Sequence, residues 1–196
     1  MKSFIICSLV FVLILATFSF ASDIKGKVKA KGVRNPANAV VYIAKIEGKT
    51  FKPPSEPVVM DQKNLTFIPH VMPILVGTKV NFLNSDDVLH NVFSPDDCAG
   101  KFNLGSWPKG QEKSYVFTKP CMVTLLCNVH PEMGAYILVL ETPYFAVTDK
   151  DGNYSIKGVP PGQYTLKIWH EKLKGQEVSI TVPDKGDVNQ NFSIRR

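Results

Sequence analysis

Apolar residues along the chain come in short, often alternating runs that are rich in Val, Ile, Phe, Tyr and Thr. Gly, Pro, Asn and Asp interrupt these runs about every eight to twelve residues, a spacing typical of an all-β sandwich or barrel. Helical periodicity is almost absent. The pattern predicts an all-β protein with strands near Ile24–Val28, Ala39–Ile46, Pro57–Met60, Thr66–Pro69, Ile74–Leu83, His90–Phe93, Glu112–Phe117, Met122–Leu126, Ala135–Glu141, Phe145–Thr148, Asn153–Ile156, Gly162–Trp169, Gln176–Val182 and Asn189–Ile194.

The predicted strands fall into three blocks, residues 22–51, 57–142 and 143–196. The segment Lys52–Pro57, which contains three prolines, separates the first two blocks and is typical of a linker. Two strands cannot form an independent domain. We therefore expect the strands of 22–51 to pack on a neighbouring block, and 143–196 is the candidate.

The N-terminus has the pattern of a secretory signal peptide. Lys2 supplies a positive charge, Phe4–Phe20 is almost entirely apolar, and Ser19 and Ala21 are small residues at the cleavage-site positions. The alternative is a membrane anchor, because the apolar stretch has about the minimum length for a transmembrane helix. We expect cleavage after Ala21 and a periplasmic or secreted protein. No later segment is long and apolar enough to span a membrane.

The composition is that of a globular protein with a mild positive charge. The chain has 196 residues, of which 44% are hydrophobic and 20% charged, and Lys and Arg exceed Asp and Glu by six. No dense basic run is present, so nucleic acid is not indicated as a partner. The charge predicts a partner with an acidic surface. Sequence motifs of nucleotide-binding loops, zinc hydrolases and serine hydrolases are absent.

The strongest chemical signal is the segment Cys127–Met133, which places Cys127, His130 and Met133 directly after an apolar strand. His90 lies upstream, at the start of another predicted strand. Two imidazoles, a thiolate and a thioether form the ligand set of a mononuclear blue-copper site, in which sulfur suits Cu(I) and imidazole also accommodates Cu(II). Pro131 stiffens the loop that holds three of these residues.

In these motifs the sequence resembles the cupredoxins, particularly amicyanin and plastocyanin, over about residues 58–141. The resemblance implies a Greek-key β-sandwich in which His90, Cys127, His130 and Met133 bind one type 1 copper ion. It also implies that Asn91 hydrogen-bonds near the Cys127 loop. Members of the family carry single electrons between redox proteins, so the expected function is electron transfer with a redox partner protein and no enzymatic activity.

The remaining cysteines of the mature chain raise a second question. Without Cys7 in the leader, three remain, and an odd number leaves one thiol unpaired or otherwise used. We expect Cys98 and Cys121, which flank the predicted copper end, to form a disulfide. The alternatives are a third thiolate ligand, which would favour Cu(I) storage or zinc, and a free redox pair.

A second resemblance covers the C-terminal block. Thr148-Asp149, Gly152 and Tyr154, followed by the segment 158–166 with Gly158-Val159-Pro160-Pro161-Gly162, are similar to the carboxypeptidase regulatory-like domain, a small transthyretin-like β-sandwich. The usual opening strands of that fold correspond to Gly26-Lys27-Val28 and to residues 39–43. The resemblance thus implies one noncatalytic sandwich made of 22–51 and 143–196, with the cupredoxin inserted between them.

Two further functions compete with electron transfer. A copper carrier or store would use the same ligands to deliver Cu(I), and a noncatalytic structural or interaction protein would use the sandwiches alone. An oxidase would need more histidines than the chain has. We interpret His70 and His170, the two remaining histidines, as ordinary strand-end residues rather than ligands.

Overall fold

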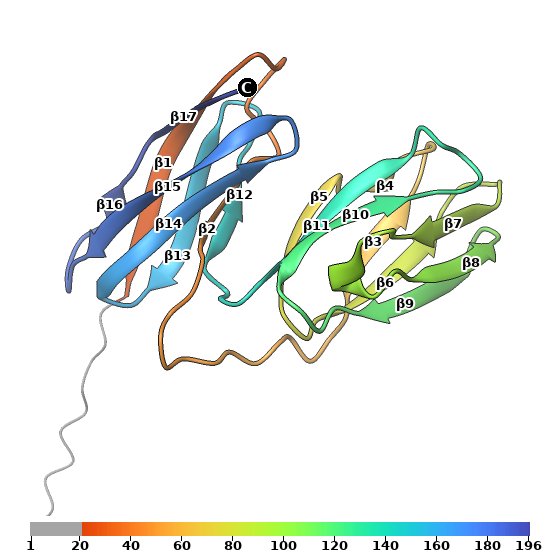
Figure 1. The fold of residues 1–196 in the computed structure, drawn as a ribbon, viewed down its shortest axis with the longest axis horizontal. Helices are drawn as coiled ribbons and strands as arrows, with labels where there is room; N and C mark the ends of the chain where they lie inside the picture. The colour runs from red at the N-terminus through yellow and green to blue at the C-terminus, as the bar shows by residue number, and fades with distance from the viewer. Residues whose placement is uncertain (1–20) are drawn as a thin grey trace, which may run out of the picture.

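The computed structural model describes residues 21–196, so residues 1–20 of the predicted leader lie outside the described residues. The chain folds into four sheets that form two sandwiches (Figure 1). We call strands β3 to β11 the first sandwich, and β1, β2 and β12 to β17 the second sandwich. The predicted all-β class is confirmed. Among the described residues no helix has the length and hydrophobicity needed to cross a bilayer.

The first sandwich packs a five-stranded sheet on a four-stranded sheet. The five-stranded sheet has the order β5-β11-β10-β7-β8, and the four-stranded sheet has the order β4-β3-β6-β9. A single 3-10 helix, η1 (Asp97–Ala99), follows β7. The strands are β3 (Val58–Gln62), β4 (Phe67–Ile68), β5 (Val71–Leu75), β6 (Lys79–Asn84), β7 (His90–Phe93), β8 (Asn103–Trp107), β9 (Glu112–Val116), β10 (Cys121–Leu126) and β11 (Gly134–Leu140).

Alternating side chains of these strands fill the space between the two sheets. In β6, for example, Val80 and Phe82 are fully buried while Lys79 is exposed. The core contains Met60, Phe67, Trp107, Leu125 and Ile137, and it also includes Cys127 and Met133. The predicted metal site therefore lies at one end of a well-packed hydrophobic core, whose rigidity limits movement of its side chains.

The second sandwich combines strands from both ends of the described chain. β1 pairs with β13, β16 and β17 in one sheet, and the other sheet has the order β12-β2-β14-β15. Ile24, Val28, Val41 and Ile43 pack against C-terminal strands in its core. The strands are β1 (Ser22–Lys31), β2 (Val40–Ile43), β12 (Phe145–Val147), β13 (Asn153–Val159), β14 (Gly162–His170), β15 (Leu173–Val182), β16 (Val188–Asn189) and β17 (Phe192–Arg195).

The two sandwiches meet sheet to sheet. Successive residues of β11 point to opposite faces, so Ile137 and Val139 enter the first core while Leu138 and Leu140 face the second sandwich. There they meet residues of β2, β5, β12 and β14, namely Val40, Tyr42, Val71, Phe145 and Trp169. The molecule is thus a stack of four sheets held by three apolar layers.

Several strand predictions were wrong in detail. The predicted strand Ile74–Leu83 is two strands, because Gly77 has a φ of 88° and turns the chain from one sheet to the other. β8 was missed, because its sequence lacks β-branched residues and it is an edge strand paired only with β7. The predicted strand Asn189–Ile194 is divided into β16 and β17, and between them the Asn191 side chain accepts a hydrogen bond from the Lys27 N–H.

We expect the buried His170 to make stability depend on pH. Burial lowers the pKa of His170, against the opposing effect of Glu171, and the charge of Lys172 lowers the pKa further. Below pH 6.5 the unfolded chain therefore binds a proton that the folded chain excludes, and the free energy of unfolding falls as pH decreases. The slope is at most about 1.4 kcal/mol per pH unit. Urea unfolding between pH 7.5 and 5.5 measures it.

The matched control is His170→Asn, whose side-chain oxygen can still accept the hydrogen bond that Lys172 N–H donates to His170 Nδ1 over 3.1 Å. This variant cannot titrate, so we expect a flatter pH dependence. The same slope in both proteins would show that other groups cause it.

Candidate metal centre

Three of the predicted ligands converge at one end of the first sandwich. His90 begins β7, while Cys127 and His130 lie in the loop between β10 and β11. One ligand atom from each lies within 4.8 Å of the others, and the two histidine Nδ1 atoms are 3.1 Å apart. His90 and Cys127 are buried, whereas His130 is partly exposed. Of these three ligands, only His130 is thus accessible to solvent.

A tight turn brings the loop residues together. The His130 carbonyl accepts a hydrogen bond from Met133 N–H over 3.0 Å, and Pro131 occupies the second position of this turn, where its fixed φ is favourable. Met133 is 1% exposed and belongs to the same apolar core as Cys127. A spacing of three residues therefore joins His130 and Met133 in one turn, with Met133 in the core that also contains Cys127.

Asn91 links the two segments that carry the ligands. Its backbone N–H points at Cys127 Sγ over 3.4 Å, and its side-chain oxygen accepts a hydrogen bond from Asn128 N–H over 3.2 Å. Its side-chain nitrogen donates to the Gly105 carbonyl and to Asn103 Oδ1 in β8. The buried Asn91 therefore holds the Cys127 loop in place from β7.

Asp86 orients His90, and sequence reasoning assigned it no role. Its carboxylate lies 2.8 Å from His90 Nε2 and also accepts hydrogen bonds from the backbone N–H groups of Asn64 and Leu65. Burial opposes ionisation, but the hydrogen bonds from Leu65, His90 and Asn64 lower the pKa of Asp86 to about 2. A neutral ring that donates from Nε2 to Asp86 leaves its Nδ1 lone pair directed at the Cys127 and His130 side.

The donor set fits copper. A buried thiol and two imidazole nitrogens that converge within 4.8 Å suit both Cu(I) and Cu(II), and the neighbouring Met133 supplies a soft sulfur of the kind found at the axial position. Asp86 stands behind His90 as carboxylates commonly do behind metal-bound histidines. His90, Cys127, His130 and Met133 are thus the residues that would hold the ion.

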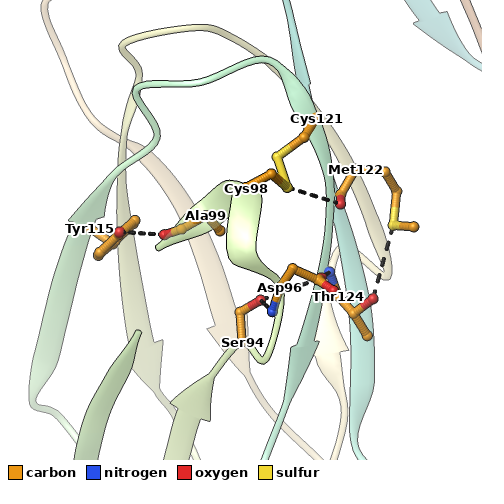
Figure 2. The surroundings of a disulfide bond; sticks show 8 residues. All are labelled: Ser94, Asp96, Cys98, Ala99, Tyr115, Cys121, Met122 and Thr124. Atoms are coloured by element: carbon orange, nitrogen blue, oxygen red, sulfur yellow. Dashed lines mark hydrogen bonds between the residues drawn. A yellow bond between two sulfur atoms is a disulfide. The ribbon is translucent and has the colours of Figure 1, made fainter. Parts of the chain in front are cut away.

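The predicted disulfide is present and, as expected, it joins the loop after β7 to the start of β10. Cys98 in η1 is bonded to Cys121 at the start of β10, whereas Cys127 follows the end of that strand. Figure 2 shows η1 attached to β10 by the disulfide and by the hydrogen bond from Thr124 N–H to Asp96. At about 3.3 Å per residue, β10 separates the disulfide from the ligand end by about 20 Å. Our expectation that this pair flanks the copper end was wrong.

Among the residues that the structure describes, His70 and His170 are not members of the ligand cluster. His70 contacts the Gly134 carbonyl, over 3.1 Å, and the Glu171 carboxylate, over 3.2 Å. It therefore connects the start of β11 to the β14–β15 turn of the second sandwich. This contact was not foreseen either, because it joins segments about one hundred residues apart.

We expect Asp86→Asn to weaken copper binding without removing any ligand. Asn can direct its amide NH₂ rather than an oxygen at His90 Nε2, and it lacks the negative charge that stabilises the His90 tautomer with its proton on Nε2. We therefore expect the affinity for Cu(II) to fall about 10- to 100-fold. Competition with a chelator of known affinity measures the change. The control is Asp87→Asn next to it, whose carboxylate is 87% exposed and forms its one ion pair among the described residues with Lys109. Equal effects of both variants would contradict the role of Asp86.

Comparisons with known proteins bear on both sandwiches. Residues 130–195 match the family model of the carboxypeptidase regulatory-like domain. This match begins at His130 and so includes β11, which the structure places in the first sandwich. β1 and β2 of the second sandwich lie outside it. The comparison with curated proteins found no match.

Solved structures similar to the chain include copper proteins. A copper-containing nitrite reductase from Thermus scotoductus SA-01 is 29% identical, with a TM-score of 0.41, over 51% of this chain and 25% of that one. An oxidised amicyanin variant is 24% identical, with a TM-score of 0.41, over 42% of this chain and 81% of that one. A purple cupredoxin from Nitrosopumilus maritimus is 24% identical, with a TM-score of 0.38, over 42% and 98% of the respective chains.

The family match agrees with the resemblance seen in the C-terminal block of the sequence, and the structure places both parts of the chain in β-sandwiches. The second sandwich contains most of the residues that match the family model. The first sandwich carries the His90, Cys127 and His130 cluster at one end of its two sheets. The chain therefore consists of one β-sandwich that carries the His90, Cys127 and His130 cluster and a second β-sandwich whose C-terminal strands match the carboxypeptidase regulatory-like domain model.

Proposed function

We propose that the protein is a periplasmic or secreted type 1 copper protein that shuttles single electrons between redox partners and is not an enzyme. The observation that carries this proposal is the convergence of His90, Cys127 and His130 within 4.8 Å at the end of a rigid core. Bound copper supplies one-electron chemistry by alternating between Cu(II) and Cu(I). The residues around it hold an arrangement acceptable to both states, so little has to move.

The surface of the ligand end supports electron transfer to another protein. His130 is partly exposed, and Val88, Leu89 and Val129, which adjoin the ligands in sequence, are 45%, 52% and 44% exposed. Apolar side chains around one accessible ligand allow close, transient contact with a partner. The formal net charge of +6 favours a partner with an acidic surface.

The test is the visible absorption spectrum of the purified protein as Cu(II) is added. We expect one equivalent of Cu(II) to produce an intense thiolate-to-copper charge-transfer band that a reductant bleaches reversibly. A colourless protein that binds only Cu(I) would replace this proposal with copper storage or delivery. No binding of either ion would leave an interaction protein built from two sandwiches.

A further inference from the structure

A row of lysines covers the outward face of β1. The strand alternates buried and exposed positions, with Ile24 and Val28 in the core and Lys27, Lys29 and Lys31 exposed on the other side. Residues two apart on a strand are separated by about 6.6 Å and share one face. The positive charges therefore form a line along one face of the strand.

The neighbouring strand β17 extends this positive surface. It runs parallel to β1 in a register that places Arg195 opposite Lys31, and Arg196 lies against Gly32. Arg195 and Arg196, at the end of β17, also line a depression of about 340 Å³ together with Lys174 of β15. We call Lys27, Lys29, Lys31, Arg195 and Arg196 the basic face.

Among the described residues, the ion pairs of β1 are confined to the start of the strand. There Asp23 pairs with Lys157, and Asp187 pairs with Lys25, each over 2.6 Å. The turn before β13 carries two more acidic residues, at positions 149 and 151. Among the described residues, no ion pair involves any member of the basic face, so its charge is available to an external anion.

The position of the basic face leaves the ligand end free. The sheet that contains β1 is the outer layer of the second sandwich, and the sheet of β2, β12 and β14 separates it from the first sandwich. Figure 1 shows β1, β16 and β17 on the side of the molecule away from the first sandwich. A large flat anionic surface can therefore contact the basic face while His130 stays accessible.

The chemistry of the basic face favours lipid headgroups over a folded protein. The large hydrophobic side chains exposed among the described residues all lie on other elements. Protein interfaces usually need buried aromatic or aliphatic anchors, whereas anionic membranes attract basic residues without them. We propose that the basic face docks the protein onto an anionic membrane surface, where its lysines and arginines contact phosphate headgroups. This inference does not depend on copper binding.

Sedimentation with lipid vesicles tests the proposal, using the chain as the expressing cell processes it. We expect binding to phosphatidylglycerol vesicles, much weaker binding to phosphatidylcholine vesicles, and loss of binding at high salt, because salt screens exposed charges. At about 1 kcal/mol per basic residue, the triple variant Lys27→Gln, Lys29→Gln and Lys31→Gln binds on the order of a hundredfold more weakly.

The matched control removes the same charge from the first sandwich. Lys63, Lys79 and Lys119 are exposed and form no ion pair in the described structure, so their triple Gln variant changes net charge equally. We expect it to retain most of the vesicle binding. Equal loss in both variants, or no preference of the wild-type chain for anionic vesicles, would overturn the proposal. Binding to polyglutamate but not to vesicles would overturn it in favour of an acidic protein.

Discussion

Cys127→Ser is expected to abolish the charge-transfer band completely and to reduce copper affinity more than any change outside the ligand set. Serine has nearly the same shape, but its oxygen stays protonated at neutral pH and cannot replace a thiolate. Because the loss of a supporting contact alone costs about 10- to 100-fold in metal affinity, the loss of this ligand should exceed about 100-fold. Visible spectroscopy and a chelator competition measure the two effects.

The structure also indicates why the folded protein should tolerate this change. Cys127 is 3% exposed, and in the wild type the Asn91 N–H points at its sulfur. In the variant the same N–H can donate a hydrogen bond to the serine oxygen. We therefore expect thermal unfolding of the metal-free variant close to that of the metal-free wild type. A Cys127→Ser protein that binds Cu(II) with an unchanged spectrum would falsify both the site and the proposed function.

The local part of the candidate site could be predicted from sequence because one turn contains it. Cys127, His130 and Met133 lie within seven residues, and a proline at the second turn position is a recognisable signal. His90, which is distant in sequence, could be added only because it completes the ligand set of a blue-copper site together with these three residues. The hydrogen bond between Asp86 and His90 was not predictable, because it depends on how the β6–β7 loop folds against the backbone of Asn64 and Leu65.

The fold shows the same division between local and distant information. Alternation along β1 and β6 predicts which side chains enter a core, and the structure agrees at these strands. β11 instead reads as a continuous apolar run, because it is covered on both faces. Such a run indicates double burial without indicating what covers the second face. The contact of Leu138 and Leu140 with the second sandwich therefore became visible only in the structure.

Removing the disulfide, by Cys98→Ser together with Cys121→Ser, is expected to lower the free energy of unfolding by about 3 kcal/mol. The bond joins residues 23 apart, and its main effect is to restrict the unfolded chain. In the folded state η1 keeps other attachments, since Asp96 accepts a hydrogen bond from Thr124 N–H and Tyr115 donates one to the Ala99 carbonyl (Figure 2). Urea denaturation of the oxidised wild type and the double variant measures the difference.

The same variant separates stability from metal binding. Because β10 lies between the disulfide and Cys127, we expect the copper-loaded double variant to retain the wild-type absorption band. Wild-type protein that is reduced with a thiol while unfolded and then refolded should have the same lowered free energy of unfolding as the double variant. A weakened or shifted band would mean that the disulfide supports the ligand loop through β10. Unchanged stability would mean that the hydrogen bonds of η1 already hold this segment in place and that the covalent link adds little.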